Sequence, residues 1–220
     1  MSVTVALDTS TALTCVGLVT DSGFEAELFD VPASGDRPGH ASKALALIQD
    51  LLNQSGSRWD DIETVVVGVG PGSFTGLRVG LATAFGIGVG SGAELKGVSG
   101  LTALLHGLGG AENAMALIDA RRHELFAASS FEVGSVDRIS RSLEDLPLAP
   151  RAICVGDGAV LERGRLIELG YEVPDEQSGL HVISALRMIE ANEAGLAIEP
   201  VAPLYVRGAD AVPTAQREGR

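Results

Sequence analysis

The sequence predicts an α/β protein that is built from two similar units. Short aliphatic runs alternate with longer segments of helical periodicity in both halves of the chain, as in α/β proteins. The run Val5-Ala6-Leu7-Asp8 corresponds to Ala116-Leu117-Ile118-Asp119, and Val67-Gly68-Val69-Gly70 corresponds more loosely to Cys154-Val155-Gly156-Asp157. With 45% hydrophobic and 20% charged residues in 220 residues, the composition is that of a globular protein and excludes general disorder.

The first half predicts a three-stranded meander that is followed by helices and buried strands. Asp21-Ser22-Gly23 supplies the chemistry of a tight turn between two strands. Leu45, Ile48, Leu51 and Leu52 mark one face of a helix. The expected strands are Val3–Leu7, Thr14–Val19, Phe24–Phe29, Thr64–Val69 and Glu94–Val98, and the expected helices are His40–Gln54, Phe74–Gly90 and Leu101–Gly107.

The second half repeats this pattern in weaker form. Expected strands are Met115–Ile118, Leu125–Phe131, Val136–Ser140, Ala152–Val155 and a closing strand Ala202–Val206, with helices from Gly158 to Leu169 and from Val182 to Ala194. A boundary near Gly109-Gly110 divides the chain into an N-terminal lobe, 1–109, and a C-terminal lobe, 110–207. The mostly polar or small residues 208–220 are expected to form a frayed tail.

Charge and hydropathy exclude several classes of protein. A net charge of -13 with only two lysines argues against a stand-alone nucleic-acid binder, because phosphate backbones attract clustered Lys and Arg. Apolar stretches are too short and too rich in glycine to span a membrane, and no signal peptide is evident. Cys15 and Cys154 lie in strand-like surroundings and are interpreted as buried free thiols. A cytoplasmic protein is expected.

Half of the glycines, 14 of 28, fall between Gly68 and Gly110. Within this segment small residues recur every four positions on the second predicted helix and therefore lie along one face: Gly76, Gly80, Ala84 and Gly88. Glycine inside a helix lowers folding stability by about 0.5–1 kcal/mol relative to alanine. A stripe of small residues is therefore expected only where another group packs closely against the helix. Close packing inside the protein and close contact with a partner helix are equally compatible with it.

The loop before this helix resembles an anion cradle because it follows a strand and opens a helix. Its candidate anion-binding residues are Asp8, Gly70, Gly72 and Ser73. However, it lacks the Gly-Lys-Ser/Thr ending of a phosphate-binding loop and the spacing of a dinucleotide fingerprint. Tight packing between strand and helix is therefore the preferred interpretation.

Catalytic signatures are missing elsewhere in the sequence. The four histidines are scattered and form no pair with metal-ligand spacing, and Ser73 lacks a nucleophile-elbow context. Asp8 and Asp119 each end a strand at a turn, where an actin-like ATPase would hold magnesium and phosphate. Turn capping is preferred for both, because Thr9 and Ser10 replace the glycine of such a loop. Arg121-Arg122-His123 is interpreted as a solvated hairpin tip.

Several segments together resemble one family. They are Ala6–Thr11, His40 with the Leu-rich helix after it, Gly70–Ala84, Asp119–Glu124, Gly156-Asp157-Gly158 and Pro203–Arg207. The block Gly70–Ala84 is highly specific, and the Asp119–Glu124 block supports it. This set is similar to the TsaB family, the non-catalytic partners of TsaD in the bacterial machinery that makes threonylcarbamoyladenosine in tRNA.

The resemblance implies an actin-like (ASKHA) fold of two similar lobes, each from a duplicated ββ-hairpin/β/α/β/α unit. It implies a TsaD-type catalytic partner, a TsaE-type ATPase in the same complex, and a homodimer when the chain is alone. ATP and metal are expected in those partner subunits, with no cofactor on this chain and tRNA contacted mainly through the partner. Carried onto this sequence, the interface residues are His40, Leu45, Ile48, Leu52, Gly76, Arg78, Gly80, Leu81, Ala84 and Gly88.

The sequence therefore predicts a scaffold subunit that activates a catalytic paralogue. The alternative is an actin-like ATPase or phosphotransferase that acts on its own through Asp8, Asp119 and the Gly68–Ser73 loop. If the small-residue stripe is the interface, Gly80→Leu or Ala84→Leu should abolish partner binding while the first lobe stays folded.

Overall fold

A computed structural model describes residues 1–220 apart from 34–38, 132–137, 141–142, 147–150, 199 and 207–220. The strands are β1 (Val3–Asp8), β2 (Thr14–Thr20), β3 (Glu25–Asp30), β4 (Ile62–Gly68), β5 (Glu94–Val98), β6 (Ala114–Asp119), β7 (Leu125–Ser129), β8 (Arg138–Ser140) and β9 (Ile153–Val155). The helices are α1 (His40–Ser55), α2 (Phe74–Ser91), α3 (Gly100–His106), α4 (Asp157–Leu161), α5 (Arg163–Glu168) and α6 (Ala185–Glu193).

Two sheets share the same topology. The larger sheet has the strand order β3-β2-β1-β4-β5, and the smaller has the order β8-β7-β6-β9. In each sheet the first strand in sequence pairs antiparallel with the next one, in a meander, and parallel with a strand that follows later in the chain. This repetition agrees with the predicted duplicated α/β unit.

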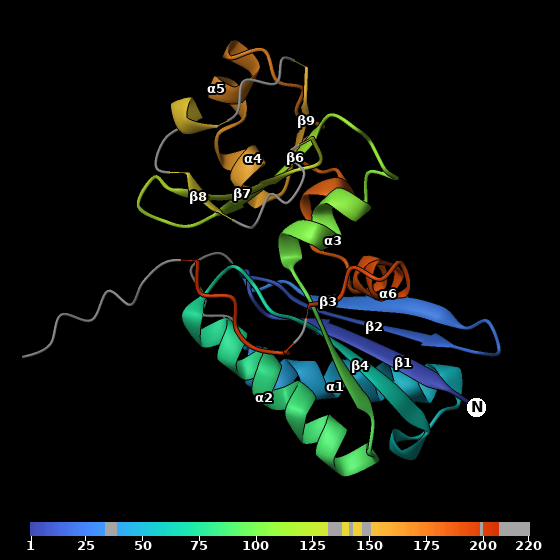
Figure 1. The fold of residues 1–220 in the computed structure, drawn as a ribbon. Coiled ribbons are helices and arrows are strands. Elements are labelled where there is room, and N and C mark those ends of the chain that lie inside the picture. Colours follow the sequence, from blue (N-terminus) through green and yellow to red (C-terminus); the bar gives the residue numbers. More distant parts are fainter. Residues whose placement is uncertain (34–38, 132–137, 141–142, 147–150, 199, 207–220) are drawn as a thin grey trace, which may run out of the picture.

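Helices and sheets alternate in layers (Figure 1). The helices α1 and α2 cover one face of the larger sheet, α6 and α3 lie between the two sheets, and α4 packs on the far face of the smaller sheet. Strand residues follow this arrangement by alternation: Val65 and Val67 join the core under α1 and α2, whereas Val66 joins the core on the α6 side.

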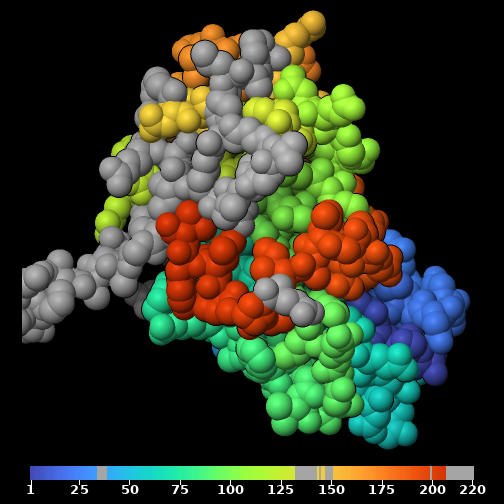
Figure 2. Space-filling model, viewed as in Figure 1, coloured from blue at the N-terminus to red at the C-terminus, as the bar shows by residue number. Residues whose placement is uncertain are grey.

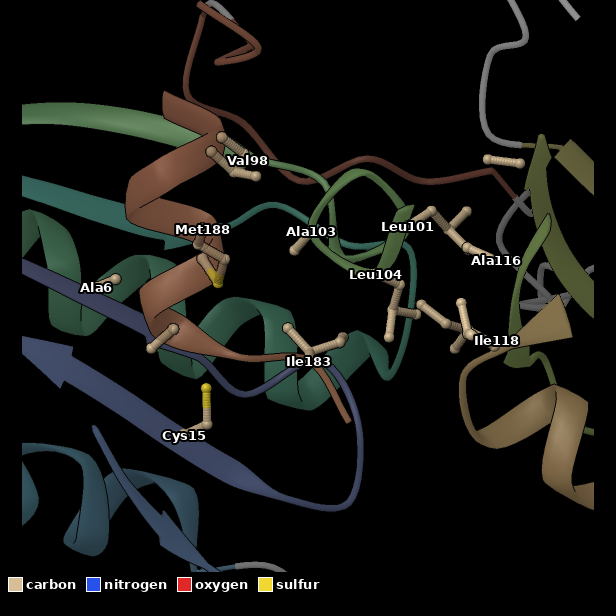
Figure 3. Close-up of a cluster of buried hydrophobic side chains, with 14 of the residues drawn as sticks. Ala6, Cys15, Val98, Leu101, Ala103, Leu104, Ala116, Ile118, Ile183 and Met188 are labelled. Atoms are coloured by element: carbon tan, nitrogen blue, oxygen red, sulfur yellow. The ribbon is translucent and has the colours of Figure 1, made fainter. Parts of the chain in front are cut away.

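The layer between the sheets is one continuous apolar cluster (Figure 3). Ala6 and Cys15 enter it from the larger sheet, Ile118 enters it from the smaller sheet, and Leu101 of α3 and Met188 of α6 fill the space between them. The helix α6 belongs to the second half of the sequence yet contacts all five strands of the larger sheet. The division at residue 109 remains a prediction, and the proposed tail lies outside the described residues.

Two expected elements differ from the structure. The predicted closing strand Ala202–Val206 does not form a strand, because Pro200 and Pro203 have no N–H to donate to the edge strand β5. Instead the segment is tied at two points, by Ile198 N–H to the Gly97 carbonyl and by Leu204 N–H to the Val69 carbonyl, each at 2.7 Å. The helix expected from Gly158 to Leu169 is divided into α4 and α5 at Glu162, whose ψ of 17° leaves the helical range.

Candidate functional site

The turn after β1 is buried, and its side chains form hydrogen bonds within the turn. Asp8 is only 2% exposed, and its Oδ1 accepts hydrogen bonds from the Ser10 N–H and the Ser10 hydroxyl, both at 2.9 Å. Its Oδ2 lies against Gly68 and has no hydrogen-bond partner among the described residues. Burial raises the pKa of Asp8, and the bonds from Ser10 oppose that rise.

The loop Gly70–Ser73 packs directly on this turn. The Ser73 N–H donates to the Ser10 carbonyl at 2.7 Å, and the Ser73 hydroxyl caps α2 by accepting from the Gly76 N–H at 3.3 Å. A side chain at Gly72 would overlap the Ser10 carbonyl. Two backbone donors at this helix end, the N–H groups of Ser73 and Gly76, are thus engaged with protein oxygens. For Gly72 and Ser73 this arrangement favours tight packing between strand and helix, the interpretation preferred from the sequence.

The equivalent turn after β6 is held by a hydrogen bond and an ion pair between Asp119 and Arg121. Asp119 Oδ1 accepts from the Arg121 N–H at 2.7 Å, and Asp119 Oδ2 pairs with the Arg121 guanidinium at 2.9 Å. Arg122 and His123 have φ values of 57° and 64°, and both are exposed. Two such residues are the centre of a type I′ hairpin turn, which normally takes Asn and Gly. The exposed tip agrees with the prediction for Arg121-Arg122-His123.

The small-residue stripe of α2 faces inward, which corrects its expected place on the surface. A side chain at Gly76 would overlap the Thr9 carbonyl, and one at Gly80 would come within 2.5 Å of the Thr9 hydroxyl. Ala84 is fully buried, and Gly88 faces Leu95 of β5. The Thr9 hydroxyl donates to the Gly76 carbonyl at 2.7 Å. The stripe therefore allows α2 to lie on the β1 turn, which is the internal-packing alternative.

Most of the other predicted interface residues are also internal. Ile48 and Leu52 of α1 are fully buried, Leu81 nearly so, while Leu45 and Arg78 are exposed. His40 begins α1 in a buried position, where its Nδ1 lies 2.8 Å from the Thr14 hydroxyl. Desolvation lowers the pKa of His40, although the nearby charge of Asp30 opposes this. This histidine joins α1 to β2.

A second row of α2 residues forms an exposed face, of which only Arg78 is among the interface residues predicted from the sequence. Phe74 is 52% exposed, Phe85 46% and Val89 87%. Ala82, Gly86 and Gly90 lie beside them on the surface, and a side chain added at Gly86 or Gly90 would meet open space. We call Phe74, Arg78, Ala82, Phe85, Gly86, Val89 and Gly90 the outer face of α2. Their spacing of three or four residues was visible in the sequence, as was the apolar character on every side of the helix.

The segment Val201–Val206, which we call the strap, ends on the first turn of α2. The Tyr205 and Phe74 rings lie 5.5 Å apart at a tilt of 32°, and the Arg78 guanidinium lies 3.8 Å over the Phe74 ring. Arg78 Nε donates to the Tyr205 hydroxyl at 3.4 Å. In Figure 2 the strap (red-orange) crosses the front of the lower lobe above the green surface.

Among the residues that the structure describes, no group of three or more His, Cys, Asp or Glu side chains is placed to hold a metal ion. None of the helices in those residues is both long and apolar enough to cross a lipid bilayer.

The duplicated sheets with helices between and around them define a two-lobed α/β protein of the actin-like class. The family model of TsaD, tRNA N6-adenosine threonylcarbamoyltransferase, matches residues 32–147, which is more than half of the chain. The chain belongs to this family. The matched segment includes α1, α2, the Gly70–Ser73 loop and the turn after β6. The turn after β1 lies outside it.

Individual relatives agree with this assignment. The chain is 36% identical over 126 residues to the tRNA threonylcarbamoyladenosine biosynthesis protein TsaB of Escherichia coli, covering 56% of this chain and 52% of the relative. It is 36% identical over 124 residues to the TsaB of Haemophilus influenzae, covering 55% and 50%. It thus spans about half the length of these relatives. A Pseudomonas aeruginosa structure, described as similar to the peptidase YeaZ, superimposes with a TM-score of 0.73 at 24% identity, covering 94% of this chain and 100% of that one.

Proposed function

We propose that this chain is the non-catalytic scaffold subunit that pairs with a TsaD-type paralogue and activates it. The complex transfers threonylcarbamoyl to the tRNA adenosine beside the anticodon. The outer face of α2 is the observation that carries the proposal. A TsaE-type ATPase completes the complex, and free chains self-associate through the same face.

The outer face has the properties of a helix-packing surface. Val89 and Phe85 are large apolar side chains that water surrounds in the free chain, so covering them is favourable. Gly86 and Gly90 carry no side chain, so the axis of a second helix can come close between those side chains. Leu45 of α1, the helix that packs beside α2, is a further exposed apolar side chain. A paralogue with a similar pair of helices offers a matching shape.

The internal turns support a scaffold role rather than independent phosphate chemistry. Asp8 is directed into the protein, and the Ser10 carbonyl lies at the start of α2. Asp119 is paired with Arg121. A net charge of -13 repels a tRNA backbone, so we assign most of the tRNA contact to the partner. On this proposal the chain acts by holding the catalytic subunit in its active arrangement.

The experiment is binding and activity of the reconstituted pair with Val89→Asp in this chain. A buried, unpaired carboxylate in an apolar interface should weaken binding at least about tenfold and reduce tRNA modification in parallel. Thermal unfolding of the free chain should not change, because Val89 is exposed. Leu161→Asp is the matched control, since Leu161 is 61% exposed on α4 of the other lobe. Unchanged affinity in Val89→Asp, with the control also unchanged, would refute this interface.

A further inference from the structure

The strap and the start of α2 form a compact group of exposed side chains. Phe74, Arg78 and Tyr205, which we call the aromatic–guanidinium triad, touch one another although each is exposed to solvent. Tyr205 comes from a part of the chain 127 residues away from Arg78. The fold therefore brings a C-terminal residue to the end of the outer face of α2.

The triad is held in place before any partner arrives. The bond between Leu204 N–H and the Val69 carbonyl anchors the strap one residue before Tyr205. The Phe74 ring supports the guanidinium from one side, and the Tyr205 hydroxyl accepts from its Nε. A side chain that is already ordered loses little conformational freedom on binding, so its contacts contribute more to affinity. Tyr and Arg are also the residues most enriched where interfaces bind most strongly.

The charge of Arg78 indicates what the triad binds. Within the described residues, no carboxylate lies at ion-pair distance from this guanidinium, although acidic residues outnumber basic ones in the chain by 29 to 16. Its Nε faces Tyr205, which leaves the two terminal nitrogens for another acceptor. A planar guanidinium prefers a carboxylate that it can contact through two nitrogens.

We propose that the triad is a recognition site for an acidic side chain of the catalytic partner. The carboxylate pairs with Arg78 while Phe74 and Tyr205 shield the pair from water. The strap, together with α2, then belongs to the partner-binding surface. This inference rests on the proposed function, because the triad continues the outer face along the same helix: Phe74, Arg78, Ala82, Phe85 and Val89 are spaced by three or four residues.

The test compares Arg78→Gln with Arg151→Gln in titrations against the intact catalytic subunit at two salt concentrations. Both changes remove one exposed guanidinium, and Arg151 lies in the other lobe beside Glu172. Arg78→Gln should weaken binding about tenfold to a hundredfold and reduce its salt dependence. Arg151→Gln should bind as the unmodified chain does. Tyr205→Phe, which keeps the ring but loses the hydroxyl acceptor, should give a smaller loss than Tyr205→Ala.

The outcomes separate this inference from the proposed function. If Arg78→Gln and Tyr205→Ala bind normally while Val89→Asp does not, the triad plays no part and the interface on α2 stands. If all three bind normally, the interface itself is wrong. If Arg78→Gln pairs normally but the assembled complex loses tRNA affinity, Arg78 faces an RNA phosphate, which overturns recognition of a carboxylate. Unchanged thermal unfolding of each variant shows that loss of binding is not loss of folding.

Discussion

The inner and outer faces of α2 carry similar residues in opposite surroundings. Inward lie Gly76, Gly80, Ala84 and Gly88 against the β1 turn and β5, and outward lie Ala82, Gly86 and Gly90 with open space above the glycines. Each row repeats small residues every four positions. The contrast teaches that a small-residue stripe specifies a close approach without specifying what approaches. Here the inner row positions the helix and the outer row remains available.

The large side chains of the helix divide in the same way. Leu77, Leu81 and Ile87 are buried, whereas Phe74, Phe85 and Val89 are exposed. A helix that is apolar all round is covered on most sides in a stable assembly. The sheet covers only one side of α2, and α1 lies beside it. The remaining side is the part that the proposed partner covers.

The largest effect is expected from the inner face, with Gly76→Ala. The added methyl overlaps the Thr9 carbonyl, which is backbone and is fixed by its position between β1 and α2. Alanine favours helix over glycine by about 1 kcal/mol, but the overlap outweighs this gain. We expect a net loss of about 2–3 kcal/mol in the free energy of unfolding, measured with urea.

The same reasoning revises the expectation for Gly80→Leu. A large side chain there meets the Thr9 hydroxyl inside the protein, so the variant should lose folding stability and not partner binding alone. Stability equal to that of the unmodified chain in both inner-face variants would mean that α2 can move away from the β1 turn. The distinction between the two faces would then fail.

A smaller effect on stability tests whether Asp8, in the turn after β1, has only a structural role. Asp8→Asn keeps the Oδ1 acceptor for Ser10 and replaces the ionisable oxygen that has no hydrogen-bond partner in the described structure. Removing a buried group that can ionise should stabilise the chain by about 1 kcal/mol at neutral pH. Destabilisation instead would indicate that a bound cation or ligand uses the carboxylate, as in the ATPase alternative.

The stability difference between the unmodified chain and Asp8→Asn should depend on pH. Burial raises the pKa of Asp8 in the folded chain above its ordinary value of 3.8. The folded state therefore holds its proton more tightly than the unfolded state, and this group opposes folding above its folded pKa. As the pH falls from there towards 3.8, protonation removes the penalty. The stability advantage of Asp8→Asn should shrink over that range in acid denaturation series.

Much of the fold could be predicted because apolar periodicity reports burial directly. The strand β5, Glu94–Val98, was predicted with its final bounds, and α1 and α2 were predicted to within one residue at each end. The closing strand predicted over Ala202–Val206 is wrong, because β propensity does not account for the N–H groups that Pro200 and Pro203 lack. The available backbone N–H donors, and not side-chain hydropathy, determine that this segment is not a strand.

The candidate site was less predictable because it depends on which face of α2 meets the sheet. Arg78 and Leu45 were assigned to the surface and are exposed, but Gly76 and Gly80 are internal. Spacing places residues on a common face and does not say which face is covered. The contact of Tyr205 with Phe74 joins distant parts of the chain, and no local pattern indicates it.

The smallest effect on stability, and the sharpest test of the two faces, comes from Gly86→Ala. The methyl enters open space on the free chain, so the lower entropy of the unfolded state should stabilise the helix by about 0.5–1 kcal/mol. If a partner helix packs closely there, the same methyl should weaken heterodimer binding in titrations with the catalytic subunit. Gly164→Ala on α5 is the control: it also enters open space and should leave binding unchanged. A variant that is more stable alone yet binds less tightly assigns Gly86 to association, whereas equal binding by both variants would leave Gly86 outside the contact.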